Sequence, residues 1–481
     1  MRKLLIIFLA VFIVSCEDFQ ELNQNVKSPI EVPGATLFSN AQKNLADQIA
    51  SINVNINNFN LWAQYITETT YTDESNFNIV NRAVPDNAWS VFYKDVLTDL
   101  AEAEKILAAE EFVTADDIAA QKNRIAIIDI LRTYTYYRMV SLWGDIPYTE
   151  ALNVDNLLPK YDDALTIYQS LLSNLSADIT ALNTNAGSFS GGSDIIYDGN
   201  VGAWKKFANS LKVKIAITLA DVPSEANAVR TAIEEAVASG VFESNADNAL
   251  FTYLDASPNT NPLWVSLVAS GRSDYVATST LGDVMNTLND PRRPFYYKDL
   301  DTNGDVIGGV YGASNAYPNF SHLSELLEDP TFPATLLDYS EVEFYLAEAV
   351  ERGYNVGGTA EDHYNNAITA SIEYWGGSAA DATAYLAQPD VAYATAAGTW
   401  QEKIGTQAWI SFFNRGFEGW TEYRRLDYPN LPMPVDAVTD SYAVRYTYPI
   451  NEQTLNGANY TSAASAVGGD KLTTKLFWDV N

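Results

Sequence analysis

The sequence predicts a mainly α-helical fold in which tetratricopeptide-like helical hairpins form a frame that carries a looped, irregular lobe. Two observations predict it. Apolar residues recur at the three- and four-residue spacing of amphipathic helices over much of the chain. By contrast, residues 240–333 and 415–481 are rich in Pro, Asn and aromatic residues and have only short helical stretches, notably 279–288. Long irregular segments in a compact domain are often functional.

The helices of the frame are predicted at residues 36–49, 55–67, 87–108, 116–142, 162–182, 201–219, 224–239, 339–352, 360–374 and 399–413. Gly144 and Pro147, which follow the longest run, are typical of a helix C-terminus. In 339–352 and 360–374, small alanines alternate with large tyrosines, as in a tetratricopeptide hairpin. The residues are Ala347, Ala349, Ala360 and Ala367 with Tyr345, Tyr354 and Tyr364. No repeat period of about 34 residues recurs elsewhere, so we expect degenerate hairpins packed as a right-handed arc.

The N-terminus predicts a lipoprotein signal peptide over residues 1–15. A basic start is followed by an unbroken apolar run, residues 4–14, that ends at Ser15 and Cys16. The run amounts to roughly 16 Å of helix, about half of a bilayer's hydrocarbon core, so we expect cleavage rather than a permanent span. Cys16 is the only cysteine and resembles the lipid-bearing residue of a bacterial lipobox. Residues 16–34 would then form the lipid anchor and a leash; the alternative is an ordinary secretory peptide that happens to carry a cysteine.

Residues 35–481 are predicted as a single soluble domain, because no other stretch reaches the ~18 consecutive apolar residues of a membrane helix. The frame would comprise 35–239 and 334–413, with looped, ligand-facing insertions at about 240–333 and 414–481. The formal net charge of −32 makes nucleic acid a poor partner, because binding phosphates depends on Lys and Arg. The same charge would repel an anionic bilayer and keep the body soluble.

The chain carries no recognisable catalytic motif. Its two histidines, His322 and His363, lie on different segments, which excludes a zincin signature, and a lone cysteine excludes a zinc–thiolate site. Nucleophile-elbow and phosphate-binding glycine motifs are also missing. Glycoside hydrolysis stays open, because it needs only two suitably spaced carboxylates and the chain has 61 acidic residues.

Aromatic residues supply the positive functional signal. The chain has 29 Tyr, 20 Phe and 10 Trp, and sugar rings lie flat on aromatic faces while their hydroxyls need polar partners. Aromatics and polar residues coincide on predicted loops at 71–81 and 309–320, and Trp264 and Tyr275 flank a third such segment. The candidate ligand-binding residues are Tyr71, Asn76, Phe77, Trp264, Arg272, Asp274, Tyr275, Tyr311, Asn315, Tyr317 and Phe320. For any single ring, core packing is the alternative, and it is the one we expect for Trp62, Trp143, Trp204, Trp375, Trp409 and Trp420.

One short motif suggests a metal ion. Asp301, Asn303 and Asp305 place oxygen ligands at alternate positions, as the start of an EF-hand calcium loop does. The match then fails, because Val306 stands where the loop needs glycine and Gly312 where it needs glutamate. A hairpin turn centred on Asn303 explains the same residues. No cofactor is required, and a structural calcium ion is kept as an expectation.

Fragments spread over nearly the whole chain resemble one family. The first fragments are EDF at 17–19, then Trp89 and Tyr93 at the start of the predicted helix WSVFYKDVLTDLAEAEKIL, YTYYRMVSLWGDIPYTEAL at 134–152, PKYDDALTIYQSLLSNLSADI at 159–179 and WKKFANSLKVKIA at 204–216. The turn DPR at 290–292, EVEFYLAEAVERG at 341–353 and GWTEYRRLDYPNL at 419–431 follow in the same order. The series closes with Tyr448, Pro449, Glu452, Asn456 and GGDKLTTKLFWD at 468–479. Each is weak alone, but their common order makes chance agreement improbable. The chain resembles the SusD/RagB family of outer-membrane lipoproteins of Bacteroidetes, in its SusD-like branch.

This resemblance implies a SusD-like fold with four tetratricopeptide-like helix pairs, and a lipid-anchored protein at the outer membrane that faces the cell exterior. It implies a binder that captures an oligomeric nutrient, usually a glycan and in some members a peptide, and delivers it to a SusC-like TonB-dependent β-barrel transporter. The departures from the family lie between residues 240 and 333, so the resemblance does not say which glycan or peptide is bound.

Overall fold

The computed structural model describes residues 32–480, so Cys16 and most of the leash lie outside the described residues. The helices are α2 Gly34–Ala50, α3 Phe59–Trp62, α4 Val84–Ser90, α5 Thr98–Ala109, α6 Ala115–Trp143, α7 Ala164–Ala181, α8 Val201–Thr218, α9 Ala226–Ser239, α10 Pro262–Trp264, α11 Ser279–Thr287, α12 Arg293–Tyr296, α13 Tyr339–Glu351, α14 Ala360–Trp375, α15 Ala379–Leu386, α16 Trp400–Ser411, α17 Gly416–Leu426, α18 Ile450–Leu455 and α19 Gly457–Ala466. The strands are β1 Ile66–Glu68, β2 Ala249–Phe251, β3 Tyr275–Ala277, β4 Tyr297–Lys298, β5 His322–Leu323 and β6 Ala334–Leu337. The predicted mainly α-helical fold is confirmed.

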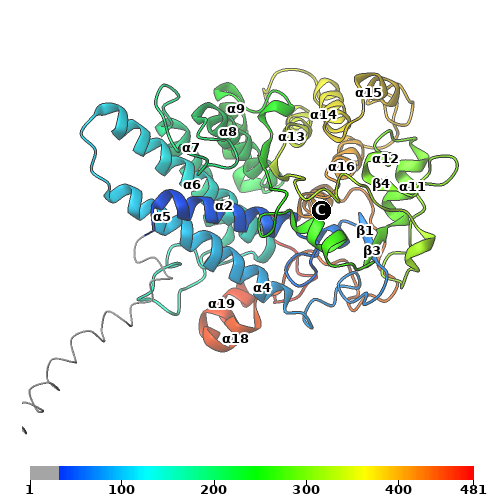
Figure 1. Ribbon diagram of the computed structural model, residues 1–481, viewed down its shortest axis with the longest axis horizontal. Helices are drawn as coiled ribbons and strands as arrows, with labels where there is room; N and C mark the ends of the chain where they lie inside the picture. The colour runs from blue at the N-terminus through cyan, green and yellow to red at the C-terminus, as the bar shows by residue number, and fades with distance from the viewer. Residues whose placement is uncertain (1–31, 481) are drawn as a thin grey trace, which may run out of the picture.

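Helices pair side by side to form the frame (Figure 1). The pairs are α2 with α5, α6 with α7, α8 with α9, and α13 with α14. Each pair is antiparallel, as cross-links between opposite ends show: in the first, Asn40 contacts Asp99 and Asn44 contacts the backbone of Asp95. Side-chain caps fix where the last pair begins, because Asp338 and Thr359 accept hydrogen bonds from the first turns of α13 and α14. The predicted helical hairpins are confirmed, and the handedness of their arc stays a prediction.

One long helix runs through residues 84–109, where the sequence predicts a helix over 87–108. Its middle is the π-helical turn η1 (Val91–Leu97), which joins α4 to α5 without a break.

The prediction of a helix over residues 55–67 is wrong. The helix there, α3, is one turn long, Gln64 takes a left-handed φ of 56°, and the chain then enters β1. The reason is that Phe59, Leu61, Trp62 and Ile66 are all buried, so their spacing satisfies a helix and a turn followed by a fully buried strand equally well.

The irregular lobe is held by short antiparallel strand pairs, β1 with β3, β2 with β6 and β4 with β5. In the first, Glu68 lies opposite Tyr275 and Ile66 opposite Ala277. Figure 1 shows β1, β3, β4, α11 and α12 gathered at one end of the molecule, beyond the paired helices. Residues 240–333 thus contain only short helices and strands.

The C-terminal segment corrects a second prediction. Residues 414–481 were expected to be a looped, ligand-facing insertion, but α17 lies in the core with ten of its eleven residues buried. Gly416 and Gly419 let it approach closely, because a Cβ atom at either position would collide with the backbone at Phe59 or with Tyr65. The tryptophans assigned to the core are all buried there, including Trp420 of α17.

A buried ion-pair network joins α17 to the frame. Glu418 contacts Arg138 of α6 at 2.7 Å and Lys214 of α8 at 3.2 Å, and Lys214 also contacts Glu341 of α13 at 2.7 Å. Arg415 adds a contact to Glu341 at 2.6 Å. Burial alone would raise the pKa of Glu418, but its cationic neighbours outweigh burial and hold that pKa below its ordinary value.

The neighbouring arginines Arg424 and Arg425 bind different kinds of partner. Arg425 pairs with Glu348 at 2.5 Å and Glu422 at 3.0 Å. Arg424 instead donates to the carbonyls of Ser141 and Val444 and stacks over Trp420, so backbone oxygens and a ring take the place of a carboxylate partner.

Over residues 32–480, none of the helices combines the length and the apolar character that a membrane crossing requires.

Glu418→Ala would leave Arg138 without its carboxylate partner and Lys214 with Glu341 alone. We expect the free energy of unfolding, measured by urea denaturation, to fall by about 3–5 kcal/mol, as when one member of a buried pair is removed. The control is Glu235→Ala. This variant also removes the glutamate partner of a lysine on α8, Lys212, but Glu235 is 63% exposed rather than buried. Its cost should stay below about 1 kcal/mol. Equal losses in the two variants would contradict the central role of the network.

Candidate functional site

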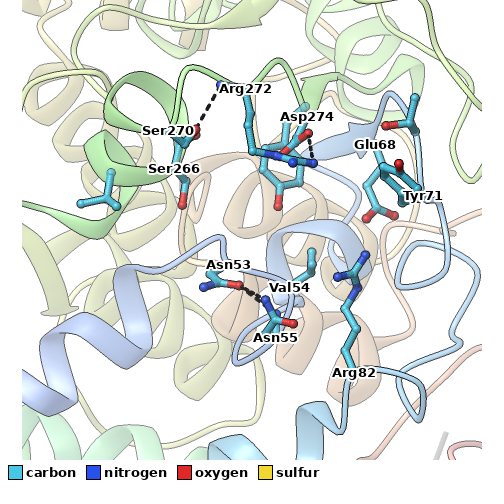
Figure 2. A pocket seen from close by; sticks show the side chains of 13 residues that line it. Asn53, Val54, Asn55, Glu68, Tyr71, Arg82, Ser266, Ser270, Arg272 and Asp274 are labelled. Carbon is cyan, nitrogen blue, oxygen red and sulfur yellow. Dashed lines mark hydrogen bonds and ion pairs between the residues drawn. The ribbon is translucent and has the colours of Figure 1, made fainter.

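A cleft of about 390 Å³ opens in the lobe beside the β1–β3 pair. Three segments supply its walls: the turn after α2, the stretch that begins at the end of β1, and the segment from η4 (Val265–Ala269) into β3. Its lining residues are Asn53, Val54, Asn55, Glu68, Thr70, Tyr71, Arg82, Val265, Ser266, Ser270, Arg272, Asp274 and Tyr275. Figure 2 shows polar side chains from all three walls pointing into the same space.

Strand pairing explains why these segments meet. Glu68 lies directly opposite Tyr275 in the β1–β3 register. Residues 70–71 follow β1 and residues 272–274 precede β3 at this same end of the strand pair, so the two segments form neighbouring walls of the cleft. The side chain of Tyr275 is held in place, because its hydroxyl donates to the carbonyl of Ile52 at 2.7 Å. The same bond positions the wall formed by the turn after α2, because Asn53 and Asn55 lie just after Ile52 in the chain.

Tyr71 stands at the mouth of the cleft with 67% of its surface exposed. Its backbone has a φ of 57°, in the left-handed region that a bulky residue rarely adopts. Phe77 and Ala83 take similar angles, so the whole stretch after β1 is strained. Strain of this kind persists where the surrounding structure enforces it, and it concentrates at functional sites.

Both arginines that line the cleft are paired with carboxylates. Arg272 binds both oxygens of Asp274, at 2.5 Å and 2.9 Å (Figure 2). Arg82 reaches Glu74, a carboxylate buried behind the cleft, at 2.7 Å. The cleft therefore offers a ligand few uncompensated charges, although the chain as a whole is strongly acidic.

Glu68 is the buried acid of the cleft, with 3% of its surface exposed. Its Oε2 accepts hydrogen bonds from the backbone N–H of Ser75 at 3.1 Å and from the Ser75 hydroxyl at 2.7 Å. Burial raises the pKa of Glu68 to about 8; the Ser75 hydroxyl opposes that rise and the neighbouring Glu74 carboxylate adds to it. Glu68 is accordingly mostly protonated and uncharged at neutral pH.

Four of the sequence-predicted ligand residues come together here: Tyr71, Arg272, Asp274 and Tyr275. Sequence reasoning missed Asn53, Asn55, Glu68, Arg82 and the serines 266 and 270. The two asparagines carried a signal, because an amide-rich SINVNINN run directly follows α2. Glu68 and Arg82 carried none, since nothing in the sequence shows that their segments fold back to one place.

Four predicted ligand residues lie elsewhere, and their assignment is corrected. Phe77 is fully buried and packs edge-on against Trp62 and Tyr442. Tyr311 is 4% exposed, so its ring belongs to the interior. Asn76 and Asn315 are buried and use their amides on backbone groups, notably the carbonyls of Gly312 and Glu68 respectively. They brace the cleft wall rather than line it.

Three further predicted residues, Trp264, Tyr317 and Phe320, are half-buried and do not line the cleft. Tyr317 stacks on His322 at 3.8 Å between ring centroids, just behind Arg272 and Asp274. His322 is held in turn by Asp299 at 2.6 Å, so this group supports the cleft from the rear.

The candidate calcium motif forms a turn. The Asp301 carboxylate accepts backbone N–H groups of Asn303 at 2.7 Å and Asp305 at 2.9 Å, and Asp305 pairs with Arg293. Within the described residues, His, Cys, Asp and Glu side chains nowhere assemble in threes that could hold a metal ion. The alternative of a turn accounts for the three residues, and calcium binding there stays a prediction.

A second cavity, also of about 390 Å³, lies between α11, α14 and α16. The carboxylates of Asp283, Asp390 and Glu402 line it, and its one ring, Tyr364, is buried with its hydroxyl on the carbonyl of Val391. It lacks the exposed aromatic and the paired charges of the first cleft, which is therefore the better candidate for the functional site.

Paired helices that hold a loop-built surface cleft define the fold class: a mainly α-helical protein built on tetratricopeptide-like helix pairs. A family model described as SusD-like, starch-binding associating with outer membrane, matches residues 24–449. The chain belongs to the SusD-like family, as its sequence fragments predicted. A comparison with curated proteins finds no match.

Solved structures agree with this assignment. A chitin-binding protein is 28% identical, over 93% of this chain and 100% of its own, with a TM-score of 0.78. A SusD homologue from Bacteroides uniformis is 25% identical, over 93% and 99% of the two chains, with a TM-score of 0.79. A chitin-binding SusD homologue from Flavobacterium johnsoniae, 24% identical over 93% and 98%, has a TM-score of 0.76 and shows the shared fold.

Glu68→Gln should flatten the pH dependence of stability. Between the ordinary glutamate pKa of 4.5 and the folded value of about 8, folded Glu68 keeps a proton that the unfolded chain releases. The folded state then binds more protons, so the stability of the wild type falls as pH rises through this window. Glutamine cannot ionise, so the thermal midpoint of the variant should rise relative to that of the wild type as the pH increases from 5 to 8. Parallel profiles for the two proteins would show that Glu68 is ionised in the folded state.

Proposed function

We propose that this protein is a lipid-anchored receptor on the outside of the outer membrane that captures an oligosaccharide in the cleft beside β1 and β3. It would deliver the sugar to a SusC-like TonB-dependent β-barrel transporter, and lipid on Cys16 would keep it at the membrane. Its part would be binding without cleavage.

The make-up of the cleft carries this proposal. An exposed tyrosine ring, Tyr71, lines the same cleft as the amides of Asn53 and Asn55 and the hydroxyls of Ser266 and Ser270. A ring face suits the C–H surface of a sugar, and amides and hydroxyls suit its hydroxyl groups. The volume falls within the roughly 300–1,000 Å³ of small-ligand sites.

The charge pairing within the cleft favours a neutral glycan. Arg272 and Arg82 already have carboxylate partners, so an acidic sugar would have to displace one of them. The family description names starch, and the 28% identical relative is a chitin-binding protein. Chitin oligosaccharides and malto-oligosaccharides are therefore the first ligands to test, with peptides as the alternative within the same family.

One observation favours a glycoside hydrolase as the second candidate: Glu68, with its raised pKa, and Asp274 both line the cleft. Against it, both oxygens of Asp274 are held by Arg272, which ties up the group that would have to act as base or nucleophile. Incubation with labelled oligosaccharides separates the candidates, because a receptor returns its ligand intact and a hydrolase releases shorter products.

Tyr71→Ala should weaken oligosaccharide binding about tenfold, which corresponds to about 1.4 kcal/mol, because the ring at the cleft mouth is lost. Titration calorimetry with chitin and malto-oligosaccharides measures it. The thermal midpoint should hardly change, since 67% of the side chain is already in water. Tyr354→Ala is the control: this half-buried tyrosine packs against Arg230 outside the cleft, and its loss should spare binding. Unchanged affinity in the Tyr71 variant would show that the oligosaccharide binds at another site.

Cys16→Ser tests the anchor. The substitution removes the sulfur that the lipid needs, so the protein should leave the membrane fraction while its thermal midpoint and ligand affinity stay at wild-type values. Fractionation of cells that express either form checks this, and a serine variant that remains membrane-bound would contradict lipidation at this residue.

A further inference from the structure

Arg82 presents hydrogen-bond donors to the cleft that the fold leaves unused. Its ion pair with Glu74 is made through Nε, the inner nitrogen of the guanidinium, at 2.7 Å. Figure 2 shows the outer end of the guanidinium pointing into the cleft, toward Glu68. Within residues 32–480, the terminal nitrogens Nη1 and Nη2 of Arg82 donate no hydrogen bond to another residue. Their N–H groups are therefore available to a ligand.

Glu68 does not occupy these donors, although it lies across from them. Its Oε2 accepts two hydrogen bonds from Ser75, and burial, which raises the pKa of Glu68 to about 8, keeps the carboxyl mostly protonated at neutral pH. A ligand carboxylate at this point would have to share the guanidinium of Arg82 with Glu74. A neutral carbonyl oxygen accepts the same N–H groups without bringing a second negative charge beside Glu74.

The turn after α2 adds a further donor. The Oδ1 atom of Asn53 is already used, because it accepts the backbone N–H of Asn55 at 3.0 Å and the side-chain amide of Asn55 at 2.7 Å. The part of Asn53 that remains for a ligand is its own amide N–H₂ group. Together with Arg82, this wall offers chiefly donors, which suits a ligand group that accepts hydrogen bonds and donates none.

Two valines interrupt the polar lining of the cleft. Val54 lies in the turn after α2 and is half-buried against the core. Val265 begins η4 on another wall and is 46% exposed. Figure 2 shows Val54 on the same side of the cleft as Arg82. Sugar hydroxyls gain nothing from such a surface, whereas a methyl group of a ligand would be removed from water there.

We propose that Arg82 and Val54 are specificity-determining residues that select an acetamido sugar. The carbonyl oxygen of the acetamido group accepts hydrogen bonds from Arg82 and Asn53, its methyl group packs on Val54, and the sugar ring lies on Tyr71. The inference rests on the proposed function, because it names the class of sugar for the same cleft. An acetamido group joins a neutral carbonyl acceptor to a methyl group, which is the combination that this wall complements.

Chitotriose and cellotriose are matched probes for this selection. The two trisaccharides share their ring and linkage, and differ only in whether the second carbon of each sugar carries an acetamido group or a hydroxyl. In titration calorimetry, the wild type should bind chitotriose about tenfold more tightly than cellotriose, because only chitotriose satisfies both the donors and the valine.

Two variants assign the preference to its residues. Val54→Thr exchanges one methyl group for a hydroxyl at similar volume, and should lower the affinity for chitotriose about fourfold while sparing cellotriose. Arg82→Lys keeps a positive charge beside Glu74 but removes the guanidinium donors, and should also reduce the preference for chitotriose. The matched control is Val268→Thr, at a valine of η4 that is 43% exposed and does not line the cleft. It should bind both sugars as the wild type does.

Equal affinity of the wild type for the two trisaccharides would overturn the inference and leave the proposed function standing, and so would binding to malto-oligosaccharides alone. Tighter binding of an oligogalacturonide would also overturn it, because Arg82 would then take a carboxylate. Equal losses for both trisaccharides in Val54→Thr would show that the valine shapes the cleft without selecting the acetamido group. If the wild type binds no oligosaccharide of any kind, the proposed function itself fails.

Discussion

Buried charge at the meeting point of four helices is the constraint on which this structure depends. Glu418 of α17 lies between Arg138 of α6 and Lys214 of α8, and Lys214 also reaches Glu341 of α13. An ionised group inside protein is costly unless its partners are in place. Helices drawn from distant parts of the chain must therefore arrive together, and the C-terminal segment has to enter the core rather than cover the surface.

The cleft inherits its geometry from this arrangement. Since α17 presses two glycines against residues 59–65, it fixes the point at which β1 begins. The pairing of β1 with β3 then sets Glu68 opposite Tyr275 and aligns the walls of the cleft. Around this rigid edge the protein carries two unfavourable features, the left-handed backbone at Tyr71 and the buried carboxyl of Glu68. Features that cost stability and coincide in one cleft are typical of a site kept for function.

The frame was predictable from the sequence because its helices are long and their apolar residues periodic, as in 116–142 and 339–374. Residues 55–67 were not, because a fully buried turn and strand leave the same pattern as a helix. Residues 414–481 misled because their Tyr, Pro and Asn content suggests irregular structure. Only the structure shows that α17 enters the core and which partners surround Arg424 and Arg425 there. Aromatic–polar clustering in the sequence selected Tyr71, Arg272, Asp274 and Tyr275, which line the candidate cleft. That rule also selected Phe77 and Tyr311, because it cannot tell a ring in a cleft from a ring in the core.

The central claim is that the cleft beside β1 and β3 holds the ligand. A crystal structure of the protein with a bound chitin or malto-oligosaccharide tests it most directly. The account predicts sugar density against the Tyr71 ring and within hydrogen-bonding distance of Asn55 or Ser270. Sugar seated instead in the equally large cavity among Asp283, Tyr364 and Glu402 would contradict it.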